Sequence, residues 1–238
     1  MGQYSASTPS GIKVLDRVVA IMMSAADHPR SLAELCEDTE LPRATVHRLA
    51  TALETHRILA RTSDGRWSIG SALATLGAGA KTQLIDAATP VMAALMNHTG
   101  ESVQLYQLTD TTRTCVAAQE PPSGLQNTVP VGSQMRLTAG SAAKVFLAHS
   151  SEQLREALLP DAAFTAAELR QVIEQGWAES VSEREPGLAS LSSPVFNSAG
   201  LFLAVLSISG PAERLGPEPG AKWSTELLQA SEKLSAAL

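Results

Sequence analysis

The stretch from residue 31 to residue 69 constrains the fold most, because it reads as two short helices followed by a hairpin. One apolar face of the first helix has the spacing i, i+3, i+4 and i+7, with Leu32, Leu35, Cys36 and Thr39. The second helix begins at Pro42 and repeats this spacing at Val46, Leu49, Ala50 and Leu53. Alternating residues around Asp64-Gly65 then predict a β-hairpin. We therefore expect a winged helix-turn-helix, a fold that places its second helix in the major groove of DNA.

The remaining faces of the second helix present polar side chains suited to contact with DNA. Arg43 and Thr45 lie nearest its N-terminus, within reach of base edges, and arginine can bind guanine through two hydrogen bonds. Arg61 and Arg66 of the hairpin are expected to contact phosphates or the minor groove. The predicted DNA-binding residues are Arg43, Thr45, His47, Arg48, Thr51, Arg61 and Arg66.

The distribution of charge favours this interpretation, although the whole chain has a net charge of −6. Residues 27–40 contain one Arg and five acidic residues, whereas residues 41–70 contain five Arg and two acidic residues. Positive charge is therefore concentrated on the second helix and the hairpin, where phosphates would lie. The alternative, an ordinary solvated helix face, leaves this contrast between the two helices unexplained.

Composition limits the other classes of protein. With 44% hydrophobic and 18% charged residues, the chain is typical of a globular protein, and it has no apolar run long enough to span a membrane. The polar start of the chain has no signal-peptide pattern, so we expect a cytoplasmic protein. Cys36 and Cys115 are too few for a disulfide framework or a zinc site, and we expect buried thiols, no metal and no cofactor.

Beyond the hairpin the hydrophobic period changes from helical to alternating. We expect a support helix over 12–26, a weak helix over 71–80, and a helix over 83–99 that is bent or broken near Pro90. Strands are predicted over 102–108, 112–119, 189–196 and 201–209, with a short extended piece at 128–131, and helices over 138–149, 165–176 and 223–238. This order predicts an α+β fold. The expected parts are a tail (1–11), a winged helix-turn-helix domain (12–70), a helical linker (71–100) and an effector domain (101–238).

A second candidate site lies at the start of the helix predicted over 138–149. The sequence Thr138-Ala139-Gly140-Ser141 is small, and the unpaired N–H groups of a helix N-terminus attract anions. Ser207 and Ser209 share one face of their strand, as Ser190 and Ser192 do on the neighbouring strand, because side chains alternate. Serines on a core-facing sheet surface need partners, which a polar ligand would supply. A simple N-cap and water-exposed serines are the alternatives.

One motif points to a different class of protein. Ser141-Ala142-Ala143-Lys144 matches the S-x-x-K nucleophile motif, but its partner signatures S-D-N and K-T-G are absent. We therefore expect no enzyme. A serine-nucleophile enzyme that uses Ser141 and Lys144 stays an alternative, as does an adaptor whose winged helix binds protein.

The chain resembles the IclR family of bacterial transcription regulators over nearly its whole length. The matching segments are SLAELCEDTELPRATVHRLATALETHRILARTSDGRWSIG, TGESVQLYQL, VPVGSQMRLTAGSAAKVFLA, QGWAESVSEREPGLASLSSPV and LAVLSISGP. The resemblance implies a GAF-like antiparallel-sheet C-terminal domain that binds a small effector, often a carboxylate, and it implies homodimers that often pair into tetramers. It places the effector at Ala139, Gly140, Leu188, Ser190, Ser207 and Ser209, to which the helix N-terminus adds Ser141.

The sequences of the segments ESVQLY, VPVGS, LTAGSAAK and EREPG also resemble those of an actinobacterial subgroup that regulates amino-acid biosynthesis, leucine in particular. This resemblance implies a repressor, or a regulator of both signs, that binds operator DNA and responds to a small polar or carboxylate metabolite. Where the family often has Cys and Asp, this chain has Ser190 and Ser180. That difference argues against transferring a particular effector from the family.

Overall fold

The computed structural model describes residues 10–26 and 28–238, so most of the tail expected at residues 1–11 lies outside the described residues. The chain divides into two compact units, residues 1–82 and 83–238. No helix in the described part is both long enough and apolar enough to cross a membrane.

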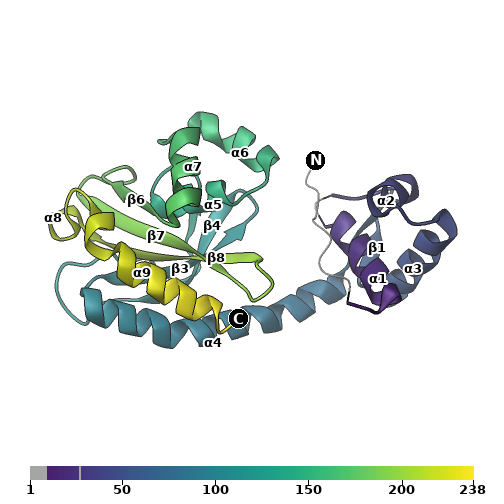
Figure 1. Ribbon diagram of the computed structural model, residues 1–238, viewed down its shortest axis with the longest axis horizontal. Helices are drawn as coiled ribbons and strands as arrows, with labels where there is room; N and C mark the ends of the chain where they lie inside the picture. The colour runs from purple at the N-terminus through teal and green to yellow at the C-terminus, as the bar shows by residue number, and fades with distance from the viewer. Residues whose placement is uncertain (1–9, 27) are drawn as a thin grey trace. The chain divides into compact units, whose positions relative to one another are not determined.

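The first unit contains a helical core and a short hairpin (Figure 1). Its elements are α1 (Lys13–Ser24), α2 (Leu32–Thr39), α3 (Arg43–Thr55), β1 (Leu59–Arg61) and β2 (Trp67–Ile69). The strands pair antiparallel, and Trp67 exchanges two backbone hydrogen bonds with Arg30, at 2.7 and 2.8 Å. Helix α3 begins at Arg43, with Pro42 as its N-cap and not its first helical residue. This is the winged helix-turn-helix that the sequence predicts.

The core of the first unit uses the predicted apolar faces of both helices. It is formed by Ile21, Leu35, Val46, Leu49, Ala50, Leu53, Leu59 and Trp67, which are each at most 9% exposed. Cys115 of the second unit is buried as expected, whereas Cys36 is only partly buried because its neighbour Leu35 occupies the core.

The predicted helix over 83–99 is not broken near Pro90, although a break is one of the two outcomes expected there. Helix α4 runs from Ser71 to Thr99 with Pro90 inside it. Proline removes one helical hydrogen bond, but tertiary packing stabilises helices more than local propensity does. The segment after residue 83 has such packing, because Leu84, Ala88, Val91, Met92 and Leu95 are buried in the core of the second unit.

The second unit is built on one antiparallel sheet of six strands. The strands are β3 (Ser102–Thr109), β4 (Thr112–Gln119), β5 (Gln134–Arg136), β6 (Ala178–Val181), β7 (Leu188–Phe196) and β8 (Phe202–Pro211), in the order β5-β4-β3-β8-β7-β6. The central register pairs Ser190 with Ser209 and Ser192 with Ser207. All four serines therefore share one face of the sheet, as their alternation predicts.

Helices cover both faces of this sheet (Figure 1). The helices after β5 are α5 (Ser141–Ala148), α6 (Glu152–Leu158), the 3-10 turn η1 (Leu159–Asp161), α7 (Ala166–Gln175), α8 (Ala212–Leu215) and α9 (Pro219–Ser235). One core lies between the sheet and the pair α4 and α9, and a second core lies between the sheet and α5 and α7. The predicted α+β class is confirmed.

Several predicted boundaries are wrong for local reasons. The extended piece expected at 128–131 pairs with no strand, because Pro130 lacks an N–H and the chain turns at Val131 and Gly132 before β5. Helix α5 starts only at Ser141, because Gly140 has φ +91° and ψ 159°, which is not helical. The last helix begins at Pro219, earlier than expected. The sequence patterns also missed β5, α6, β6 and α8, all of which are short.

Candidate DNA interface and ligand cavity

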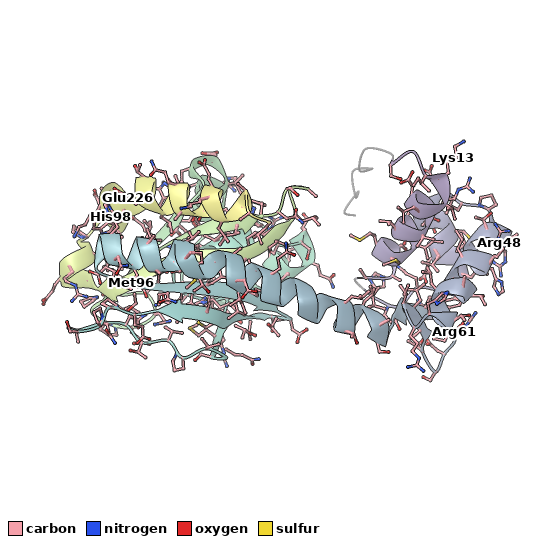
Figure 2. All side chains as sticks on the ribbon, turned by 90° about the horizontal axis from the view of Figure 1, so that it is seen from below. Lys13, Arg48, Arg61, Met96, His98 and Glu226 are labelled. Atoms are coloured by element: carbon pink, nitrogen blue, oxygen red, sulfur yellow. The ribbon has the colours of Figure 1, made fainter. Side chains whose placement is uncertain are left out.

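Helix α3 presents the predicted DNA-binding side chains away from its buried face. Arg43, His47, Arg48 and Thr51 are exposed and Thr45 is partly exposed. Among the described residues, none of these five side chains forms a hydrogen bond or an ion pair. Figure 2 shows Arg48 at the outer side of the first unit and Arg61 on the hairpin. The α3 cations are thus available to phosphates or bases.

The two arginines of the hairpin are held by the protein itself. Arg61 lies over the Trp67 ring, 3.9 Å from its centroid, and donates to the Gly65 carbonyl at 3.1 Å. Arg66 contacts Glu34 of α2 at 2.9 Å and Asp64 at 3.4 Å. The guanidinium groups of Arg61 and Arg66 therefore hold the hairpin in place. Because they already have partners in the protein, these two arginines are less available to DNA than the arginines of α3.

The predicted effector residues lie together in the second unit, around a small cavity between the N-terminus of α5 and the serine face of the sheet. Six of the seven border it, namely Gly140, Ser141, Leu188, Ser190, Ser207 and Ser209. The seventh, Ala139, is not part of the lining, and its carbonyl instead accepts hydrogen bonds from Arg113 at 3.2 Å. The cavity volume is about 20 Å³, enough for a water molecule.

The serines of the cavity form a hydrogen-bonded chain. Ser141 Oγ lies 2.7 Å from the hydroxyl oxygens of both Ser190 and Ser192, and Ser192 donates to Ser207 at 2.9 Å. In a separate set of hydrogen bonds, Ser209 accepts from Asn127 and donates to Gln104, both at 2.8 Å. Nearly all of these groups are buried, so the chain satisfies polar atoms that would otherwise be costly inside the protein.

Arg113 is the buried cation of the cavity and is 3% exposed. Its Nη1 atom donates to the carbonyl of Arg136 at 2.9 Å, while Nε has no partner in the described part of the chain. Burial lowers the pKa of Arg113 to about 10 and raises the pKa of the adjacent Tyr106 to about 12. Because a buried charge is unfavourable unless paired, Arg113 favours an anion in this cavity.

A second arginine adds to the positive charge. Arg184 borders the cavity and lies 3.4 Å from the exposed carboxylate of Glu185. No Asp or Glu is among the residues that border the cavity, although two arginines are. The arrangement therefore suits a small anion held by guanidinium and hydroxyl groups.

Sequence reasoning missed six bordering residues, which are Tyr106, Arg113, Asn127, Ala142, Ser180 and Arg184. One signal was available for Arg113, because it alternates with Cys115 and so faces the core from its strand. Ala142 directly follows the predicted Ser141 on α5, whereas the other four come from separate strands and loops, which only the folded chain brings together.

Lys144 does not serve Ser141 as the S-x-x-K motif would require. Its ammonium lies 2.5 Å from Glu183 and 3.2 Å from Glu168, and it donates to the Glu179 carbonyl at 3.0 Å. Ser141 bonds only to other serines among the described residues. The nucleophile alternative is therefore wrong, because Lys144 is neutralised elsewhere.

The fold and the two sites define a class of protein, a regulator that joins a helix-turn-helix DNA-binding domain to a ligand-binding α+β domain. Residues 14–63 match the family described as the IclR helix-turn-helix domain, and residues 77–236 match the family described as Bacterial transcriptional regulator IclR C-terminal. The chain therefore belongs to the IclR family of bacterial transcriptional regulators. Membership in this family also sets aside the enzyme and adaptor alternatives.

Relatives of this family match the chain from end to end. The HTH-type transcriptional regulator BhcR of Paracoccus denitrificans is 26% identical, over 98% of this chain and 90% of its own. The transcriptional repressor IclR of Escherichia coli is 25% identical, over 99% of this chain and 90% of its own. The crystal structure of an IclR-family regulator from Rhodococcus sp. is 28% identical with a TM-score of 0.63, and the match covers 99% of this chain and 97% of that one.

Proposed function

We propose that this regulator binds an operator through α3 and that a small anionic metabolite bound in the cavity changes its affinity for DNA. The observation that supports the DNA-binding site is the basic face of α3, where Arg43 and Arg48 are exposed beside His47 and have no side-chain partner in the described part of the chain. Arg43, at the first turn of the helix, is placed to reach base edges. Arg61 and Arg66 hold the hairpin and contact phosphates.

The effector is a small carboxylate or a similar anion. Arg113 supports this proposal because its buried guanidinium has no carboxylate partner among the described residues. Arg184 and the serine hydroxyls supply further donors. The cavity is small, so the anionic group enters it while the rest of a larger metabolite extends toward solvent.

The regulated genes are proposed to be those of amino-acid biosynthesis, leucine in particular, as the resemblance of LTAGSAAK and EREPG to that subgroup suggests. The regulator is proposed to repress these genes, as the repressors among its relatives repress theirs. Thermal-shift screening with amino acids and their carboxylate precursors tests the effector, because a ligand of the native state raises the melting temperature.

A homodimer is proposed to present two α3 helices to a palindromic operator. Helix α1 supports it with an exposed apolar stripe, because Leu15 and Val19 are 48% and 43% exposed and Ile12 before them is 57% exposed. Light scattering of Leu15→Glu tests this proposal. We expect a monomer, whereas Val131→Glu, at an exposed valine of the other unit, keeps the oligomer of the wild type.

The DNA-binding site is tested with Arg43→Ala and with Arg170→Ala, a matched exposed arginine on α7. Arg43→Ala should cost about 1–3 kcal/mol of operator binding free energy, measured by fluorescence anisotropy. Arg170→Ala should leave the affinity unchanged. An unchanged affinity of Arg43→Ala would remove this residue from the site.

A further inference from the structure

Glu183 binds two partners at the edge of the cavity. Its Oε2 atom accepts the N–H of Gly140 at 3.1 Å, and its Oε1 atom lies 2.5 Å from Lys144 Nζ. Gly140 borders the cavity and directly precedes α5. The peptide N–H that was expected to attract an anion is therefore already occupied by a carboxylate of the protein.

Glu183 belongs to the segment 182–187, which joins β6 to β7. The same segment contributes Arg184 to the cavity lining, next to Glu183 in the chain. Both ends of the segment have left-handed backbone conformations, with φ +55° at Ser182 and +78° at Gly187. For Ser182 this conformation is unfavourable, since left-handed backbone favours glycine. Segments that move over ligand sites change their backbone angles at a few such terminal positions.

The Glu183 carboxylate is the principal side-chain link between this segment and α5. Lys144 is only 7% exposed, and Glu168 and the Glu179 carbonyl hold its ammonium in place. The two ends of the segment are held separately. Ser182 and Gly187 bond to each other, Ser182 also bonds to Leu188, and Gly187 also bonds to Ala212. Loss of the Glu183 contacts would therefore free the middle of the segment from α5 while its ends stay attached. The contact of Arg184 Nη1 with Met135 Sδ of β5, at 3.0 Å, would then be the side-chain contact that remains in the middle.

We propose that residues 182–187 form a lid over the cavity, latched by Glu183, and that the latch and an anionic ligand exclude each other at the Gly140 N–H. This inference rests on the anionic effector proposed above. Two carboxylates in contact repel each other, and Gly140 has a single N–H to donate. An anion that takes this N–H displaces Glu183 and releases the lid from α5, while Arg184 of the same segment contacts the anion. Ligand occupancy is thereby converted into a change in the position of the lid.

The latch is tested without any ligand, by hydrogen exchange of the full chain. In Glu183→Gln, the amide group has one acceptor oxygen, so it can serve Lys144 or Gly140 but not both. We expect the amides of Gly140 and of Leu188, whose N–H bonds to the Glu185 carbonyl in the middle of the segment, to exchange about tenfold faster than in the wild type. Glu174→Gln, the same change at an exposed position of α7, should leave both rates unchanged.

A second variant, Glu183→Asp, tests the latch if Glu183→Gln does not fold. Glu183→Asp keeps the negative charge beside Lys144, but it is shorter by one methylene and cannot span both partners. It should also accelerate exchange at Gly140 and Leu188. Exchange rates equal to those of the wild type in the folded variants would overturn the latch.

Mutual exclusion is tested with acetate as the probe, against chloride at the same ionic strength. We expect Glu183→Gln to bind acetate about tenfold more tightly than the wild type, by NMR titration, because the competing carboxylate is gone. Equal acetate affinities would overturn the exclusion.

Arg113→Met separates this proposal from the effector proposal. If Arg113 holds the anion, Arg113→Met should lose acetate binding in both the wild-type and Glu183→Gln backgrounds. Acetate binding that survives Arg113→Met, or that is absent from every variant, would overturn the anionic effector site. The hydrogen-exchange rates measured without ligand test the lid proposal independently of the acetate result.

Discussion

Arg66 of the hairpin donates a hydrogen bond from Nη1 to Glu34 Oε2 of α2 over 2.9 Å. The same carboxylate accepts the N–H of Ser31 at 2.6 Å, which makes Glu34 part of the capping box of α2. One side chain therefore caps the first helix of the helix-turn-helix and anchors the wing. The position of the wing is coupled in this way to the N-terminus of α2 and not only to α3.

This shared contact predicts a pH dependence of stability. The Ser31 hydrogen bonds, with a smaller contribution from Arg66, lower the pKa of Glu34 from 4.5 to about 2. Because the folded-state pKa is depressed, the contribution of Glu34 to stability is present above about pH 4.5 and is lost as the pH falls toward about 2. Glu34→Gln should lower the melting temperature at neutral pH and leave it unchanged near pH 2. Glu37→Gln, at an exposed position of α2, should have no effect at either pH.

A second prediction contrasts two arginines of the DNA-binding unit. Arg48 has no partner among the described residues, whereas Arg66 is neutralised by Glu34 and Asp64. Arg48→Ala should therefore reduce the slope of log affinity against log salt by about one, as the loss of one phosphate contact does. Arg66→Ala should reduce that slope by less, in anisotropy titrations over a range of salt concentrations. A larger reduction for Arg66→Ala than for Arg48→Ala would contradict this assignment.

The winged helix was predictable because its signals are local. The apolar spacing in α2 and α3 and the Asp64-Gly65 turn each lie within a few residues. The serine face was predictable for a similar reason, since alternation in a strand has a fixed period of two. Patterns of this kind survive folding unless tertiary contacts oppose them.

The missed features depend on contacts between distant residues. Arg113 and Arg184 meet at the cavity from β4 and from the β6–β7 connection, and Glu183 reaches Gly140 across 43 residues of sequence. No local sequence pattern predicts contacts between residues so far apart in the chain. The continuity of α4 through Pro90 has the same origin, because burial of Met92 and Leu95 outweighs the local signal to break the helix.

A third prediction concerns the serine chain. Ser192 is fully buried and bonds to both Ser141 and Ser207, so Ser192→Ala leaves two hydroxyls with fewer partners. The expected loss of unfolding free energy is about 1–3 kcal/mol, measured by urea denaturation. Ser198→Ala, in the exposed turn before β8, is the matched control and should change stability by less than about 0.5 kcal/mol. Equal losses in the two variants would show that the serine chain contributes nothing to stability.

The last prediction concerns a close approach at Gly210 of β8. A Cβ atom at this position would overlap the Glu101 carboxylate and lie 3.0 Å from Leu215 Cδ1. Glu101 cannot simply move away, because it is 3% exposed and accepts two hydrogen bonds from Arg214, at 2.8 and 2.7 Å. Gly210→Ala should therefore destabilise the fold by about 1–3 kcal/mol, the range for overpacking a core.

A double-mutant cycle identifies the cause of that loss. In a Glu101→Ala background the carboxylate that would overlap the new methyl group is gone, so Gly210→Ala should cost less there than in the wild type. The difference between the two costs is the interaction free energy of the pair, measured by urea denaturation of the four proteins. If Gly210→Ala costs the same in both backgrounds, the loss arises from Leu215 or the strand backbone, and the clash with Glu101 is refuted.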